Sequence, residues 1–495
     1  MGRRLTEGRA ARGGRGRAAR RGRRRALAVL AATSMCVVAG FPTQATAAGT
    51  PSPYAFAEGA EVIEGATSNS GGHLLVAGST YKSVLPRVGQ RFYRLELKAK
   101  ENAYVSATAV PKLGTKVSYA DGLKVSVQDA NGYTCSPLDT EKARFGSAES
   151  ARPITATASR RVGTDEKSCT GAGTYYVLVE RISDPESSQE EWDLELRVAS
   201  EPVLRLAGTT TPPRTGDSAS PEPPAGARKV RAGGTSFNKA RGLENGIWGD
   251  RLEPGETRFY RVPVDWGQRL SVGAELGGSD TGTTERDQGF VPTALVMSLT
   301  NPVRAEVDDA DTAYDGKQSV TALRPLPPVA YENRYDPASK VSAMRFAGWY
   351  YLAVHLNPDV ARKFGRAPLD VTLRITVEGS PRPGPSYAGA SVPADEFSVT
   401  ERDTEAARRG ESNAADTSTG GGGGDDRVMA AVAAGGIGTG MGLLVILGAW
   451  TLIARRRAAA VALRRAASSS SSAVPRAGAG AGTAHAAEFG PPRGW

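Results

Sequence analysis

The sequence predicts an all-β protein made of two tandem antiparallel β-sandwiches, followed by disordered linkers and one transmembrane α-helix. First, Arg-Phe-Tyr-Arg occurs at 91–94 and again at 258–261. Second, Gly-x-Tyr-Tyr follows in both copies, at 173–176 and 348–351. Third, apolar residues between 50 and 380 alternate with a period of two, and no segment there keeps a helical period over several turns. The chain therefore contains one β-rich module twice.

The N-terminus has the three parts of a secretory signal peptide. Residues 1–25 are polybasic, the next stretch is uncharged and apolar, and 45–47 read Ala-Thr-Ala, the small-x-small pattern of a cleavage site. We expect residues 1–47 to be removed. The pair Arg20-Arg21 leaves twin-arginine export open beside the general secretory route. Cys36 is an alternative lipidation site, but it lies within the apolar stretch and would be discarded with it.

Two cysteines remain in the exported chain, Cys135 and Cys169, and both belong to the first module. An even number of cysteines in an exported domain predicts a disulfide, with two free thiols as the alternative. A metal site would need further ligands, and no histidine lies between the two.

Five strands of the first module (53–200) match five strands of the second (230–379) in the same order. They include, respectively, residues 91–97 and 258–264, 103–109 and 270–276, 123–127 and 295–299, 175–179 and 350–354, and 192–198 and 371–377. In the first pair the alternation places Tyr93 and Tyr260 in the core, whereas Phe92, Phe259 and the flanking arginines face outward. This number of strands can form two packed sheets.

These motifs carry a family resemblance. An aromatic-Tyr-Arg strand, a turn from Asp129 to Gly132, a Gly-x-Tyr-Tyr strand and a closing alternating strand together resemble the bacterial pre-peptidase C-terminal domain. The resemblance implies a small jelly-roll-like β-sandwich that accompanies a secreted protease or other hydrolase without being catalytic itself. The chain departs from this pattern because no catalytic domain accompanies the two modules.

The connecting segments differ from the modules in composition. Residues 206–229 are rich in Thr and Pro and predict an extended linker, and 380–427 predict a disordered stalk. Residues 428–453 carry no charge and would form a helix of about 39 Å, enough to cross a membrane. Arginines at 455–457 then place the tail, 454–495, in the cytoplasm, and we expect that tail to be disordered. The topology would be single-pass type I.

Within the predicted span, Gly436 and Gly440 have the spacing that allows two helices to approach closely. Helix-mediated dimerisation is one interpretation, and a simple anchor is the other.

The net charge of +10 argues against a nucleic-acid partner once it is divided along the chain. The terminal segments 1–25 and 454–495 carry +10 and +6, so the span 48–427 holds −6. A nucleic-acid-binding domain needs a basic face on its folded part.

The sequence offers no catalytic constellation. Only His73, His355 and His485 are present, and the common metalloprotease, serine hydrolase and phosphate-binding motifs are absent. We expect His355 to lie on the outward, solvated face of its strand. We therefore predict no catalytic residue and no bound cofactor, and the chain is not expected to be an enzyme.

Two features distinguish the second module. An acidic run contains Asp308, Asp309, Asp311 and Asp315, whose oxygens would suit Ca²⁺, although the spacing fits no established loop and a solvated loop is the alternative. Trp266 lies at a predicted hairpin tip and Trp248 aligns with Tyr81. Both tryptophans are candidate ligand contacts through stacking on a sugar or insertion into a protein groove, and edge packing is the alternative.

Together these features predict a non-catalytic cell-envelope surface protein. Its sandwich modules would bind or scaffold another envelope protein, a hydrolase or a wall polymer. The alternatives are a single-span signalling or regulatory subunit and a cryptic extracytoplasmic hydrolase.

Overall fold

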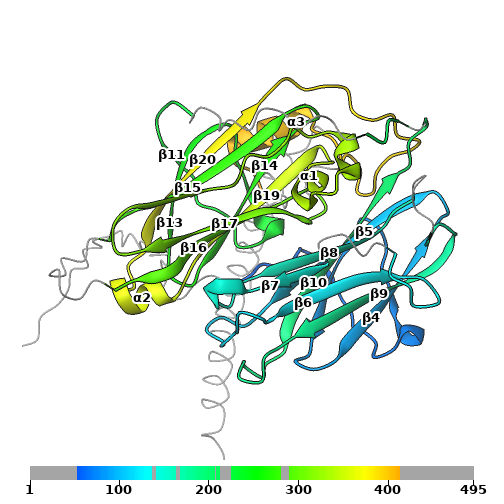
Figure 1. Cartoon of the computed structure of the whole chain (residues 1–495), viewed down its shortest axis with the longest axis horizontal. Coiled ribbons are helices and arrows are strands. Elements are labelled where there is room, and N and C mark those ends of the chain that lie inside the picture. The colour runs from blue at the N-terminus through cyan, green and yellow to red at the C-terminus, as the bar shows by residue number, and fades with distance from the viewer. Residues whose placement is uncertain are drawn as a thin grey trace, which may run out of the picture. The chain divides into compact units, whose positions relative to one another are not determined.

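The computed structural model describes residues 53–135, 141–162, 168–206, 208–211, 224–279 and 289–412. The predicted signal peptide, transmembrane helix and tail lie outside these ranges, as do Gly436 and Gly440. Within them, no helix has the length and apolar character needed to cross a membrane. The described chain is mostly β, and its sheets form sandwich-like pairs (Figure 1).

The first module contains ten strands in two five-stranded sheets. The strands are β1 (Glu61–Val62), β2 (His73–Leu74), β3 (Thr80–Leu85), β4 (Gln90–Leu97), β5 (Glu101–Val110), β6 (Gly122–Gln128), β7 (Lys142–Arg144), β8 (Ile154–Arg160), β9 (Gly173–Ile182) and β10 (Trp192–Pro202). One sheet has the order β1-β3-β10-β5-β8, and the other has the order β2-β4-β9-β6-β7. Apart from the short parallel pairs β1-β3 and β2-β4, all pairings are antiparallel.

The second module repeats this arrangement strand for strand. Its strands are β11 (Lys229–Val230), β12 (Arg241–Gly242), β13 (Gly246–Leu252), β14 (Thr257–Val264), β15 (Arg269–Leu276), β16 (Val291–Thr300), β17 (Glu306–Tyr314), β18 (Ser319–Ala322), β19 (Gly348–Leu356) and β20 (Leu369–Glu378). The sheet orders are β11-β13-β20-β15-β18 and β12-β14-β19-β16-β17, the same permutation as in the first module.

Strand register confirms the alignment of the two Arg-Phe-Tyr-Arg motifs. Tyr93 pairs with Val177 and Tyr260 pairs with Leu352, the same position after each Gly-x-Tyr-Tyr. The predicted match of the last strand was wrong by two residues. Leu194 corresponds to Val371, because both are opposite the equivalent end of the neighbouring strand. A shift of two keeps every side chain on its face, so alternation alone could not detect it.

The second aromatic of each motif is a core residue, as predicted, and its hydroxyl is satisfied within the core. Tyr93 and Tyr260 are both fully buried. The Tyr93 hydroxyl lies 2.9 Å from Ser83 Oγ, and the Tyr260 hydroxyl donates to Asp250 over 2.6 Å. Each partner lies ten residues earlier, on the preceding strand, which belongs to the opposite sheet of the same module. Both copies therefore pair the buried hydroxyl in the same way.

The Gly-x-Tyr-Tyr motif is a strand start with a built-in turn. Gly173 and Gly348 have φ of +142° and +129°, a region that other residues rarely adopt. The tyrosine two positions later closes the turn, because its hydroxyl donates to a carbonyl four residues before it, from Tyr175 to Gly171 over 2.7 Å and from Tyr350 to Phe346 over 2.8 Å.

Cys135 and Cys169 form a disulfide, with Cα atoms 5.4 Å apart, which confirms the prediction. The chain-entropy estimate for a loop of 34 residues gives a stabilisation of about 4 kcal/mol. The second module has no cysteine.

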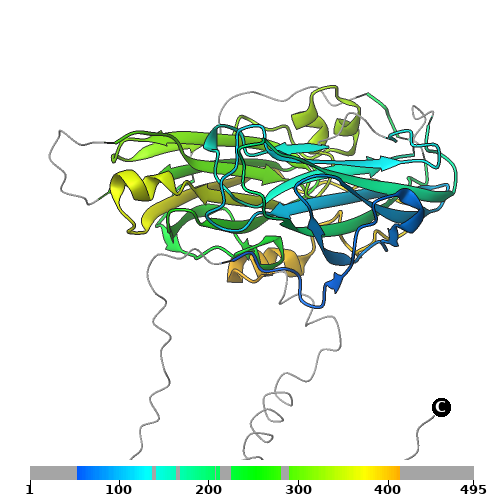
Figure 2. The ribbon, with the colours of Figure 1, turned by 90° about the horizontal axis from the view of Figure 1, so that it is seen from below.

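The segment after the second module is ordered up to residue 412, unlike the disordered stalk predicted for it. Residues 380–400, which we call the strap, pair with the end of β10 through bridges of Val392 with Ser200 and of Tyr387 with Leu204. Helix α3 (Glu401–Arg409) follows and begins with a capping box of Thr400 and Asp403. Figure 2 shows α3, in orange, against the outside of the strands. The composition of the strap is typical of a disordered segment, but residues far away in the sequence, such as Ser200 and Leu204, hold it in place. Composition does not reveal such partners.

The remaining helical elements are short. They are η1 (Asn69–Gly71), η2 (Gly146–Ala148), η3 (Phe237–Lys239), η4 (Tyr331–Tyr335), α1 (Ser339–Ala343) and α2 (Asp359–Phe364).

The two modules contact each other through non-equivalent sheets. The sheet of the first module that contains β10 faces the sheet of the second module that contains β19, and we call these the inner sheets. Tyr104 on β5 packs edge-on against Phe346, and Thr157 on β8 donates to Arg304 O. The predicted linker therefore joins two modules that touch.

Two buried ion pairs cross this contact, and both use glutamates of β10. Glu195 lies 2.6 Å from Arg304, and the two side chains are 0% and 2% exposed. Glu201 lies 2.8 Å from Arg334, at 0% and 9% exposed. Burial alone would raise the pKa of Glu201, but the charge of Arg334 and hydrogen bonds to the carboxylate lower it.

The outward residues of the second motif were predicted to be solvated, and this was wrong. Arg261 and Phe259 are each only 1% exposed, and the Arg261 guanidinium lies 3.9 Å from the ring centre of Trp349. In the first module, the equivalent Arg94 is 42% exposed. In the second module, Arg261 donates to Glu411 O beyond α3 over 3.2 Å, and Phe259 packs against Phe237 and Tyr54.

Candidate functional site around Trp266

Trp266 lies in the turn between β14 and β15, but these strands belong to different sheets, so the predicted hairpin was wrong, and the indole is not an exposed tip. The residue is 7% exposed, because the strap passes over it. Arg382 N donates to Trp266 O over 2.9 Å. A Cβ placed on Gly384 would lie 2.5 Å from Trp266 Nε1, so the strap fits there only with a glycine.

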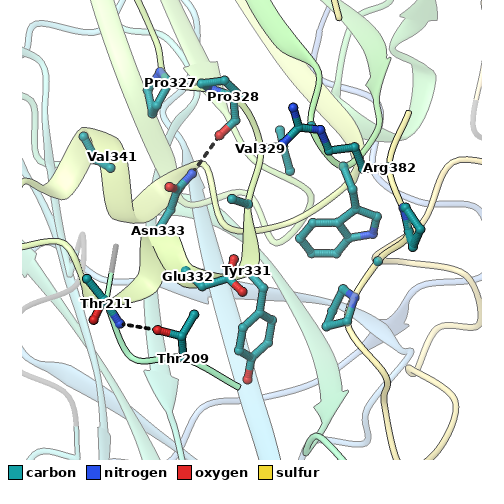
Figure 3. A pocket seen from close by; sticks show the side chains of 16 residues that line it. Thr209, Thr211, Pro327, Pro328, Val329, Tyr331, Glu332, Asn333, Val341 and Arg382 are labelled. Atoms are coloured by element: carbon teal, nitrogen blue, oxygen red, sulfur yellow. Dashed lines mark hydrogen bonds between the residues drawn. The ribbon is translucent and has the colours of Figure 1, made fainter. Parts of the chain in front are cut away.

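Between Trp266, the strap and η4 lies a pocket of about 500 Å³ (Figure 3). Its wall is largely apolar, with two aromatic rings and four prolines. The lining residues are Thr209, Thr211, Trp266, Gly267, Pro327, Pro328, Val329, Ala330, Tyr331, Glu332, Asn333, Val341, Arg382, Pro383, Gly384 and Pro385. In Figure 3, Arg382 lies on one side of the pocket, and Thr209 and Thr211 lie on the other.

Two nearly buried side chains of the pocket keep a polar atom without a partner. Asn333 is 1% exposed, and its amide nitrogen donates to Pro328 O over 2.9 Å and to Met344 O over 2.8 Å. These two bonds fix the amide orientation, and within the described residues Oδ1 accepts no hydrogen bond. Trp266 Nε1 likewise donates none within that part of the chain. Neither atom is one of the fully buried unpartnered atoms of the described chain, so a ligand or water in the pocket can reach both.

Two charged side chains of the pocket are also unpaired. Neither the Glu332 carboxylate nor the Arg382 guanidinium forms an ion pair or hydrogen bond with any described residue. The pocket thus presents one free cation and one free anion within the described chain, beside the free donor of Trp266 and the free acceptor of Asn333.

Tyr331 is the second aromatic of the pocket, and one of its faces is already occupied. The Arg334 guanidinium lies 3.4 Å from its ring centre, and Arg334 itself pairs with Glu201 of the first module. Burial raises the pKa of Tyr331 to about 12, against the lowering effect of Arg334, so the hydroxyl is protonated at neutral pH. The pocket wall is therefore braced by the contact between the modules.

Trp248, the other predicted ligand contact, is a core residue. It is 2% exposed, and its indole nitrogen donates to Glu244 O over 2.9 Å. Arg231 and Lys229 lie 4.3 Å and 5.1 Å from its ring centre. The indole is buried in the core of the second module, which leaves no open face for stacking on an external ligand.

The four aspartates do not converge on one point. Asp308 is buried and pairs with Arg324 over 2.8 Å and with Lys340. Asp309 and Asp311 lie on the opposite, exposed face of β17. Asp315 accepts from Lys317 N in the following turn. Across the described ranges, no group of three or more His, Cys, Asp or Glu is placed to hold a metal ion.

His355 is buried between the modules, and the predicted solvated position was wrong. Its Nε2 lies 2.7 Å from Ser150 Oγ, and its Nδ1 lies 2.9 Å from Thr257 Oγ1. Burial, with the charge of Arg152 adding to it, lowers the pKa of His355 to about 3. A base of that pKa is a poor proton acceptor at neutral pH. The second ring nitrogen contacts the Thr257 hydroxyl, where a catalytic histidine would usually contact an orienting carboxylate. The Ser150–His355 hydrogen bond is therefore best interpreted as a contact between the modules.

Sequence reasoning found Trp266 but missed Asn333, Tyr331, Glu332 and Arg382. These residues come from η4 and the strap, which have no counterpart among the described residues of the first module. The available signal was the pair of proline clusters at 327–328 and 383–385, which flank these residues.

No family model matches the chain, and no curated protein matches it. Solved structures show only a weak, unspecific likeness. The pre-peptidase C-terminal domain of collagenase from Bacillus anthracis is 14% identical, with a TM-score of 0.15, over 30% of this chain and 99% of that one. The tandem CBM22 domains of Paenibacillus barcinonensis Xyn10C are 10% identical, with a TM-score of 0.17, over 67% and 95%. Tandem CBM51 modules of a family 98 glycoside hydrolase from Streptococcus pneumoniae are 8% identical, with a TM-score of 0.15, over 61% and 85%.

Proposed function

We propose that this protein is a non-catalytic surface protein of the cell envelope, whose pocket around Trp266 binds a segment of another envelope protein or a wall polymer. The observation that carries the proposal is the pocket itself. Its volume of about 500 Å³ lies within the range of about 300–1,000 Å³ that is usual for ligand sites. Its wall is mainly apolar, with a few unpaired polar atoms.

Three sequence features and one structural feature support the proposed placement outside the cytoplasm. The predicted signal peptide 1–47, the apolar span 428–453 and the arginines that follow it give a type I orientation. The disulfide of Cys135 with Cys169 fits an oxidising compartment. On this proposal, the modules are extracytoplasmic and a single helix anchors them.

The non-catalytic assignment rests on the chemistry of the pocket. None of its lining residues is a histidine or a cysteine, and its single carboxylate, Glu332, has no second carboxylate beside it. Acid-base or covalent catalysis normally needs such pairs.

The experiment is capture from envelope extracts with a blocked pocket as the control. Gly384→Ala places a methyl group against Trp266 Nε1, whereas a Cβ on Gly389 of the same strap meets nothing closer than 3.8 Å. We expect the wild type and Gly389→Ala to retain the same protein or wall fragment, and Gly384→Ala to lose it. Retention that is equal in all three proteins would show that the pocket is not the binding site.

A further inference from the structure

We propose that the pocket around Trp266 binds an extended, proline-containing peptide segment, with Trp266 Nε1 donating to a peptide carbonyl and Asn333 Oδ1 accepting from a peptide N–H. This inference rests on the proposed function and names the ligand class of the same site. The partner would be an envelope protein that presents such a segment on its surface.

The first argument is the match between unpaired atoms and backbone chemistry. An extended peptide exposes both carbonyl acceptors and N–H donors, because it makes no internal hydrogen bonds. The pocket offers one fixed donor at Trp266 and one fixed acceptor at Asn333, on side chains that are only 7% and 1% exposed. A peptide would satisfy both atoms together.

The second argument is the shape and composition of the wall. Aromatic-lined grooves bind proline-rich segments, in part because such a ligand is already extended before it binds and loses little conformational entropy. Here Tyr331 and Trp266 lie beside four prolines, Pro327, Pro328, Pro383 and Pro385. Because proline fixes φ, these four prolines limit the backbone freedom that the wall could lose on binding.

The third argument concerns charge. Arg382 and Glu332 line the same pocket without pairing to each other or to other described residues. A peptide with an acidic side chain near Arg382 and a basic one near Glu332 would be favoured. The reverse order would place like charges against each other at both positions.

Sugar stacking fits the same pocket less well. A stacked sugar needs an open aromatic face, but Trp266 is 7% exposed and Arg334 covers one face of Tyr331. A polyhydroxyl ligand would also leave much of its hydrogen-bonding capacity facing prolines and valines.

The probes are two blocked synthetic peptides of Pro and Ala, one with Asp and Lys at opposite ends and one with these residues exchanged. A soluble chito-oligosaccharide is the third probe. Binding to the purified protein is measured by calorimetry for the wild type, Gly384→Ala, Gly389→Ala and Arg382→Glu, and thermal unfolding checks that each variant is folded.

We expect the wild type to bind one peptide order in preference, and Gly384→Ala to bind it about tenfold more weakly or worse, since loss of one such hydrogen bond costs about 1–3 kcal/mol. Gly389→Ala should bind as the wild type does, and Arg382→Glu should lose the preference between the two peptides, because either order then places one like charge and one opposite charge against the two carboxylates.

The peptide assignment is overturned if neither peptide binds, or if Gly384→Ala leaves peptide binding unchanged. If the oligosaccharide binds instead, and Gly384→Ala abolishes that binding, the ligand class is wrong while the proposed binding function stands. If the envelope capture described above also shows no dependence on Gly384, both proposals fail.

Discussion

Strands β10 and β20 occupy the same position in their modules, yet their outward faces have opposite fates. On β10 the outward Glu195 and Glu201 are fully buried against the second module. On β20 the equivalent of Glu195 is the half-buried Thr372, and Glu378, at the position of Glu201, is exposed. Both strands alternate apolar and polar residues. The same pattern therefore occurs on β10, whose outward side is buried against the second module, and on β20, whose outward side is partly exposed.

The difference teaches that polar residues on one side of a strand show only that this side does not face the hydrophobic core of its own module. The same side can still be buried against another module. On β10 each carboxylate meets an arginine of the second module and further donors. Glu195 also accepts from Tyr54 and Asn238, and Glu201 also accepts from Tyr104. Buried charges persist only with such partners. The comparison can be tested by removing equivalent groups from the two faces.

The largest effect is expected from Glu195→Ala. The substitution leaves Arg304 without its carboxylate at 2% exposure, and such a loss costs about 3–5 kcal/mol of unfolding free energy. Thr372→Ala, at the equivalent position of β20, should change stability by about 0.5 kcal/mol or less. Urea unfolding of both variants measures the difference, and equal effects would contradict the assignment of β10 to a buried contact.

A smaller effect, dependent on pH, is expected at His355 of the inner sheet. Its pKa is lowered to about 3, whereas the unfolded chain has the ordinary value of about 6.5. As pH falls below about 6.5, the unfolded state therefore binds a proton that the folded state does not.

Stability should consequently fall with acid by up to about 1.4 kcal/mol per pH unit in this window. His355→Gln should remove that slope between pH values of about 7 and 5, measured by urea unfolding. The control is Glu180→Gln at the equivalent position of the outer strand β9, which should keep it. A slope that survives His355→Gln would have to come from other groups.

The smallest effect concerns two arginines at equivalent positions. Arg197 of β10 lies 2.6 Å from Glu396 of the strap, at 14% and 12% exposed, whereas Arg374 of β20 lies 3.1 Å from Glu275, at 39% and 22%. We expect Arg197→Ala to cost about 1–2 kcal/mol and Arg374→Ala less than about 1 kcal/mol, because solvent screens the exposed pair. Thermal unfolding is sufficient, and a larger loss for Arg374→Ala would reverse the comparison.

The sequence predicted what depends on local pattern and repetition. The alternation around Tyr93 and Tyr260 identified core strands, and the repeat aligned most of them. The sequence did not reveal which sheets face each other. The contact between the sheets depends on pairs such as Glu195 and Arg304, which are more than a hundred residues apart. His355 and Arg261 were misplaced for the same reason, since His355 is covered by Ser150 of the first module and Arg261 by the chain that follows α3.

The candidate site shows the same limit. Trp266 was recognisable because the two copies differ there, with Ala99 in the first. For Asn333 and Arg382 no comparison between the copies was possible, because η4 and the strap have no equivalent among the described residues of the first module. Their convergence on Trp266 is produced by tertiary packing, which no periodicity encodes.

The contact between different sheets of two like modules has a consequence for symmetry. Two copies related by a two-fold axis bury the same face on both partners, so no equivalent face remains for a third copy. The two modules here bury different faces, so each buried face has an equivalent on the other module that the contact does not cover. One such counterpart is the outward side of β20, where Asp370 and Arg374 are partly exposed. If that side were apolar, a further molecule could add there and offer the next uncovered face in turn. Asp370 and Arg374 instead form solvent-exposed ion pairs with Arg251 and Glu275, and burying such charges against a further molecule would disfavour that growth.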